Sequence, residues 1–227
     1  MKGIVLCLIC SLFFLNFSGL DIRKVEQSEW GPALARAGSE KRTLISSDWY
    51  KKGRALAASG DLSGAIDAFT RAIKLNPQSS LSYNDRGDAY DKSGEPQQAI
   101  SDFTRAVELN PEFIIAYSNR GAVYLGLGNY EQAISDFDRI IKINPKYVQA
   151  YVSRSDAYRR SGKLQKAIDD LTKAIELNPK SAQAYANRAV IYDELGNGEG
   201  AIEDLKKAAR LGHKMAQEFL KSKGEEW

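Results

Sequence analysis

The chain has 227 residues, of which 27% are charged and 43% hydrophobic, with a formal net charge of +3 at pH 7. Residues 1 to 45 hold six of the 32 basic and four of the 29 acidic residues, which leaves 26 and 25 for the rest. A nucleic-acid surface needs clustered Lys and Arg. The near-neutral main part therefore argues against nucleic acid as a partner.

An apolar run from 4 to 17 follows Met1 and Lys2. It is shorter than the about 20 residues of a membrane span and matches the apolar region of a secretory signal. We expect residues 1 to 19 to be a signal peptide of a periplasmic or secreted protein. The alternatives are a short uncleaved membrane anchor, which would be the chain's only membrane contact, and a plain disordered N-terminus. Both cysteines, Cys7 and Cys10, lie in this run, so a cleaved chain has no thiol for a disulfide or a metal.

Residues 20 to 45 mix charges with glycine and proline and show no sustained period, which predicts a linker. A short helix is expected at Pro32 to Ala37. The alternative to a linker is that Trp30 packs on the first repeat as an N-terminal cap.

Five copies of a 34-residue unit follow, and glycine, an Ala-Ile pair and Asn-Pro return at this step. Such a period predicts stacked supersecondary units. The copies are placed at 46 to 79, 80 to 113, 114 to 147, 148 to 181 and 182 to 215.

One copy predicts two antiparallel helices. In the third, Tyr117, Gly121 and Tyr124 follow a helical spacing, and Gly128 stands where a left-handed residue would end that helix. A second helix carries Ala133 and Phe137 on one side and ends before Pro145. The small Ala133 would let the two backbones approach closely.

At these residues the sequence resembles the tetratricopeptide repeat (TPR) family, whose pattern the first copy meets at Trp49, Gly53, Ala65, Phe69, Ala72 and Pro77. The resemblance implies an all-α, right-handed α-solenoid of five helix-turn-helix repeats. After copy five Met215, Phe219 and Leu220 follow one helix face, and a terminal repeat needs a partly polar cover, so residues 216 to 227 are expected to be a C-terminal capping helix and tail. Arginine stands before the repeat glycine where the family usually has leucine, and Ala189 replaces that glycine in copy five.

Those arginines occur together with an aspartate 16 residues later in copies two to five, whereas copy one has Lys52 and Ala68 instead. One interpretation is a ladder of salt bridges between the two helices of each copy, worth at most about 1 kcal/mol each if exposed. The alternative is that each aspartate pairs along its own helix, three residues on. Those partners would be Arg105, Arg139, Lys173 and Lys207.

The residues predict no catalytic, metal or cofactor site. The single histidine, His213, has no second ligand beside it, and the glycines are spread at the repeat period rather than clustered as a phosphate loop. We therefore expect a protein that is not an enzyme.

The resemblance implies that the first helices of the repeats line a concave groove that holds peptide segments of other proteins. The residues we place there vary between copies, and the alternative for each is a merely solvated surface. They are Tyr50, Arg54, Asn84, Asp88, Ser118, Asn119, Asp156, Arg159, Asn187 and Asp193.

The predicted groove is mixed in charge, because Arg54, Arg159 and Arg160 could receive acidic side chains. Asp88 and Asp91 could receive basic ones. Tyr50, Asp85 and Gln149 do not fit the clamp by which some family members hold a free C-terminal carboxylate. The predicted function is an exported, non-catalytic adaptor that docks protein partners. The alternatives are a membrane-tethered assembly factor and a regulatory subunit of a partner enzyme.

Overall fold

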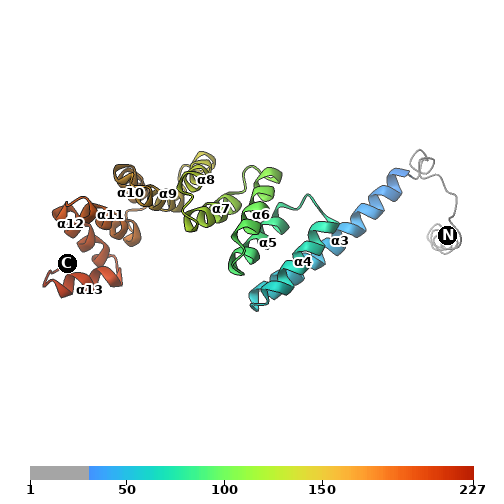
Figure 1. Cartoon of the computed structure of the whole chain (residues 1–227), viewed down its shortest axis with the longest axis horizontal. Coiled ribbons are helices and arrows are strands. Elements are labelled where there is room, and N and C mark those ends of the chain that lie inside the picture. Colours follow the sequence, from blue (N-terminus) through green and yellow to red (C-terminus); the bar gives the residue numbers. More distant parts are fainter. Residues whose placement is uncertain (1–30) are drawn as a thin grey trace, which may run out of the picture.

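The structure, a computed structural model, describes residues 31 to 227, with side chains from Ile45 onward. The expected signal peptide lies outside these residues. In the described part all regular elements are α-helices that pack as successive pairs into an elongated stack (Figure 1). Their bounds are α3 Gly31–Ala58, α4 Leu62–Leu75, α5 Ser80–Lys92, α6 Pro96–Leu109, α7 Ile114–Gly126, α8 Tyr130–Ile143, α9 Val148–Arg160, α10 Leu164–Leu177, α11 Ala182–Glu194, α12 Gly198–Arg210 and α13 Lys214–Ser222.

We call the first helix of each pair helix A (α3, α5, α7, α9, α11) and the second helix B (α4, α6, α8, α10, α12). The turn between them depends on a glycine, as at Gly128, which has a φ of 78°. Behind it the Asn129 N–H donates to the carbonyl of Tyr124 at 2.9 Å. Glycine reaches this left-handed conformation without a Cβ penalty, so the predicted end of helix A is confirmed.

The Asn-Pro step ends four of the five B helices and also shapes the turn that follows. The Asn144 side-chain oxygen accepts from the backbone N–H of Lys146 at 3.1 Å, and the asparagines of the other three turns do the same. Proline cannot continue a helix, and the asparagine supplies an acceptor for the turn that replaces it. The next helix A therefore starts at a fixed place.

Between the helices of one pair the backbones approach closely. Ala133 is fully buried, and a Cβ built on Gly121 would lie 2.9 Å from the Phe137 ring. Glycine is thus required here because the aromatic ring occupies the space of a side chain. Copies one and two have the same arrangement, with Gly53 under Phe69 and Gly87 under Phe103.

Copies four and five make the same contact between the two helices with a different pair of residues. Ser155 and Ala189 replace the glycine, and Leu171 and Leu205 replace the phenylalanine. Leucine has no ring to lie against the helix A backbone, so a small side chain is admitted. The departure of copy five from the repeat pattern at Ala189 is therefore matched by Leu205 on the other helix of the pair.

The predicted linker from 20 to 45 differs from the structure where the two overlap. Helix α3 begins at Gly31 and runs without a break to Ala58, so residues 31 to 45 are helical and the short helix expected at Pro32 to Ala37 is part of a longer one. The physical reason is that Pro32 stands in the first turn, where proline is tolerated, and the isolated Gly38 weakens a helix without ending it. Trp30 lies outside the described residues.

At the other end, α13 packs Ala216 and Leu220 against the last repeat. His213 is the N-cap of this helix, because its Nδ1 accepts from the Ala216 N–H at 3.2 Å. The single histidine therefore has a structural role. In the part of the chain that the structure describes, no helix is both long and apolar enough to cross a membrane.

Candidate functional site

A buried ladder of ion pairs joins helix A to helix B. We call the face of the solenoid that the A helices form the helix A side. The Arg120 guanidinium in α7 donates two bonds to Asp136 in α8, at 2.9 and 2.6 Å. Its third bond, 2.9 Å long, goes to the Thr104 hydroxyl in the preceding repeat. One arginine thus joins both helices of its own pair to helix B of its neighbour.

Copies two to five share this arrangement, so the ladder is confirmed and the own-helix alternative is wrong. Arg105 and Lys173 instead pair with glutamates three residues on, and Arg139 donates to the Pro111 carbonyl. The four Arg–Asp pairs of the ladder are largely buried, with side chains 5% to 17% exposed, so the limit of about 1 kcal/mol for exposed pairs does not apply to them. The rungs are Arg86 with Asp102 and Thr70, Arg120 with Asp136 and Thr104, Arg154 with Asp170 and Asp138, and Arg188 with Asp204 and Thr172.

Copy one replaces the rung with a stacked cluster. Ala68 is buried at the aspartate position, and Lys52 lies over the Trp49 ring at 5.0 Å from its centroid. Arg71 lies over the same ring at 4.4 Å. The first pair is therefore held by packing and cation–π contacts.

The helix A side itself has two distinct regions. In the N-terminal region the Tyr50 hydroxyl donates to Asp85 at 2.8 Å, and the Asn84 amide donates to the other oxygen of the same carboxylate. Asn84 accepts from Asn119 at 3.2 Å, and Arg54 lies 4.0 Å from Asp85. Four of the predicted site residues are thus joined through Asp85, which the sequence analysis did not place in the site.

Tyr50 should titrate at an unusually high pH. Burial and the hydrogen bond to Asp85 raise the pKa of its phenol from 10.0 to about 12. The fold favours the neutral phenol, so its contribution to stability is complete below pH 10 and is lost as the pH rises from 10 to about 12. At about pH 11 we expect Tyr50 to remain protonated while ordinary tyrosines ionise.

The measurement is the near-ultraviolet absorbance of the folded chain, compared with Tyr50→Phe. At about pH 11 the wild-type chain and Tyr50→Phe should show the same absorbance change from ionised tyrosines, because Tyr50 is still protonated. Asp85→Asn should bring the Tyr50 pKa back toward its ordinary value. A phenol that titrates with the other tyrosines in the wild-type chain would contradict this assignment.

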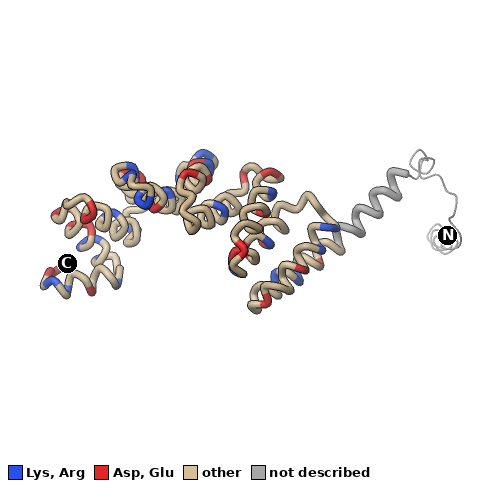
Figure 2. Tube along the Cα trace, in the orientation of Figure 1, with Lys and Arg blue, Asp and Glu red and all other residues tan. Residues whose placement is uncertain are grey.

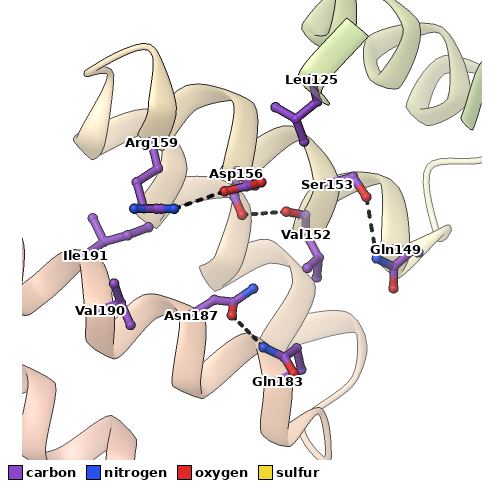
Figure 3. Close-up of a pocket in the computed structure, with 11 residues that line it drawn as sticks. Leu125, Gln149, Val152, Ser153, Asp156, Arg159, Gln183, Asn187, Val190 and Ile191 are labelled. Atoms are coloured by element: carbon purple, nitrogen blue, oxygen red, sulfur yellow. Dashed lines mark hydrogen bonds and ion pairs between the residues drawn. The ribbon is translucent and has the colours of Figure 1, made fainter. Parts of the chain in front are cut away.

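The C-terminal region holds an open pocket of about 410 Å³ between α9 and α11, with Leu125 reaching in from α7 (Figure 3). Its apolar lining includes Val152, Val190 and Ile191. Gln149 and Gln183 stand at the same position of their repeats and contribute amides. The pocket is an open, concave surface lined by both apolar and polar side chains.

Three predicted site residues line this pocket, namely Asp156, Arg159 and Asn187. Asp156 pairs with Arg159 at 3.3 Å and with Arg160 at 3.0 Å. Arg159 also reaches Glu194 in the next repeat at 2.9 Å, and Asn187 accepts from Gln183. Arg159 and Arg160 are therefore already paired with carboxylates of the chain, and their pairing with acidic side chains of a partner stays a prediction.

The other three predicted residues belong to neither region. Asp88 pairs with Lys92 at 2.6 Å, Ser118 is half-buried, and Asp193 is exposed on α11. The sequence analysis missed Leu125, Val152 and Val190 because it looked for polar variation on helix A. The signal was present, since apolar residues stand where other copies have charged or polar ones.

Charges of both signs are interspersed along the described helices (Figure 2). The stacked pairs, the turn glycines and the ladder define a helical repeat solenoid whose helix A side is hollowed at the pocket between α9 and α11.

Comparison with protein families places it more closely. Models described as tetratricopeptide repeat match residues 80 to 113, 114 to 147 and 182 to 211, and a model described as TPR repeat matches 53 to 94 and 156 to 196. Together they cover well over half of the sequence, and the chain belongs to the tetratricopeptide repeat family. No curated protein matches it.

Solved structures with the same fold include MamA and YrrB. A crystal structure of MamA is 26% identical, with a TM-score of 0.69 over 76% of this chain and 94% of its own. MamA from Desulfovibrio magneticus is 19% identical, with a TM-score of 0.69 over 75% and 96%. YrrB, described as a TPR protein with an unusual peptide-binding site, is 22% identical, with a TM-score of 0.66 over 83% and 98%.

Proposed function

We propose that this protein is a non-catalytic adaptor that binds segments of other proteins along the helix A side of its solenoid. The observation that carries the proposal is the contrast between two sets of residues. The ladder and the Gly or Ala contacts return in successive copies, whereas the outward positions of helix A change from one copy to the next. A fixed frame with a variable, recessed surface suits recognition of a partner.

The structural likeness to YrrB, whose description names a peptide-binding site, supports a peptide segment as the bound form. The near-equal numbers of basic and acidic residues beyond residue 45 favour protein over nucleic acid as the partner. No cofactor is needed for such a role.

The test compares two arginine substitutions in the full chain. Ala122 is exposed on α7 at the repeat position that Asp156 and Val190 occupy in the pocket, whereas Ser135 is exposed on helix B α8. Partners captured by the wild-type chain from cell envelopes should be lost with Ala122→Arg and retained with Ser135→Arg. Retention with both variants, or loss with Ser135→Arg alone, would contradict the proposal.

We further propose that the adaptor is exported to the cell envelope, on the strength of the apolar run from 4 to 17. A tether is the second candidate, since the same run could remain as a short anchor. N-terminal sequencing of the mature protein separates the two. A start shortly after Gly19 supports export of a cleaved chain, and a start at Met1 in the membrane fraction supports the tethered assembly factor.

A further inference from the structure

Two exposed positions of α7, the helix that contributes Leu125 to the pocket, carry small residues. On α7, the neighbouring helix, Ala122 and Gly126 are exposed and stand at the repeat positions of Asp156 and Arg160. A Cβ on Gly126 would meet no atom within 4 Å, and its backbone is not left-handed. Neither packing nor conformation therefore requires this glycine, although glycine lowers helix stability. This exposed position of α7 therefore carries no side chain.

The charged residues around the pocket form ion pairs with one another. Asp156 binds two guanidiniums, and Arg159 also binds Glu194. The side chains of these residues are between 29% and 45% exposed, so an occupant would cover part of them. A charged side chain placed here would have to compete with an existing ion pair or stay without a partner, and it would lose part of its hydration in doing so. This balance selects an uncharged occupant.

The apolar and amide groups indicate how such an occupant is held. Leu125, Val152 and Val190 line the pocket, where Val190 is 49% exposed and Val152 only 8% (Figure 3). The Gln183 amide donates to Asn187 at 2.6 Å within one exposed helix face, and the Gln149 amide contacts Ser153 at 3.4 Å. Each amide offers both a donor and an acceptor, which are the groups that pair with the backbone of an extended chain.

We infer that this pocket is the anchor site for an extended, uncharged peptide segment that inserts one aliphatic side chain of valine, leucine or isoleucine type. The aliphatic side chain lies against Leu125, Val152 and Val190, and the amides of Gln149 and Gln183 bond to the peptide backbone. The inference rests on the proposed function, because it names the class of segment that the helix A side binds.

The test uses a displayed library of short random peptides, selected on the full chain, and two matched variants. Val190→Lys adds a charge at the pocket. Leu81→Lys adds the same charge at a residue of similar exposure, 52%, on helix A α5 outside the pocket. Because both residues are exposed on helices, circular dichroism should show both variants folded. Selected peptides should share an aliphatic residue with uncharged neighbours. Val190→Lys should weaken their binding at least about tenfold and Leu81→Lys less than about twofold.

The outcomes separate this inference from the proposed function. Peptides with a charged consensus, or peptides weakened by Leu81→Lys and not by Val190→Lys, would overturn the anchor site and leave the helix A side as the binding surface. A dimer of the full chain that Val190→Lys dissolves would assign the pocket to a second copy and overturn the peptide occupant. Selection of no peptide, or of peptides weakened only by Ser135→Arg on helix B, would overturn both proposals.

Discussion

Replacing Asp136 with alanine should lower the free energy of unfolding by about 3 kcal/mol, because removal of one partner leaves a buried charge without compensation. The Asp136 and Arg120 side chains are only 5% and 15% exposed, and their closest atoms are 2.6 Å apart. The arginine also ties α7 to the preceding repeat through Thr104. The loss should therefore reduce the cooperativity of unfolding across the two repeats as well as its midpoint. Urea denaturation followed by circular dichroism measures both.

Asp138 provides the control on the same helix. It also pairs with a ladder arginine, Arg154, but its side chain is 51% exposed and Arg154 keeps its bonds to Asp170. Asp138→Ala should cost less than about 1 kcal/mol, as exposed pairs do. Equal costs for the two substitutions would show that burial of the ladder contributes nothing to its strength.

Gly121→Ala should destabilise the chain by about 1–3 kcal/mol through overpacking, since the new methyl group would lie 2.9 Å from the Phe137 ring. Copy five already contains the compensated form, with Ala189 and Leu205 at these two places. Adding Phe137→Leu should therefore recover part of the loss, with a coupling energy of about 1 kcal/mol in a double-mutant cycle. Thermal and urea unfolding of the wild-type chain, the two single variants and the double variant supply the four values.

Gly126→Ala is the matched control on the same helix. A Cβ there meets no atom within 4 Å, and alanine is the better helix former by about 0.5–1 kcal/mol. This substitution should leave stability unchanged or raise it slightly. A loss as large as that of Gly121→Ala would mean that helix α7 is sensitive to any added side chain, and the ring contact would not be the cause.

Much of the fold could be predicted from the sequence, because each repeat unit is local. Gly128 and Pro145 mark the ends of two helices within one copy, and the same step predicts the next pair. The long α3 could not be predicted in the same way. Gly31, Pro32 and Gly38 resemble the residues of a loop, yet proline in a first turn and one isolated glycine are both compatible with a helix.

The partners in the ladder could not be chosen from the sequence alone. Asp136 has a basic residue three positions on, Arg139, and another 16 positions before it, Arg120. Spacing allows both pairings, and only the distance between α7 and α8 decides for Arg120. Thr104, the third member, lies in the preceding copy, 16 residues before Arg120, and its part in the ladder depends on how neighbouring repeats stack.

The pocket was harder still, because three helices from three copies build it. Asp156, Arg159 and Asn187 were predicted from their variability on helix A. Val190 and Leu125 were missed, since a single apolar residue on a helix is expected in the core unless the stacking is known.

The location of a bound segment tests the account most directly. Nuclear Overhauser effects between an unlabelled bound peptide and the methyl groups of the labelled full chain give that location. The account predicts contacts with helix A methyl groups, foremost those of Leu125, Val152 and Val190. Contacts confined to methyl groups of the B helices α6, α8 and α10 would contradict it.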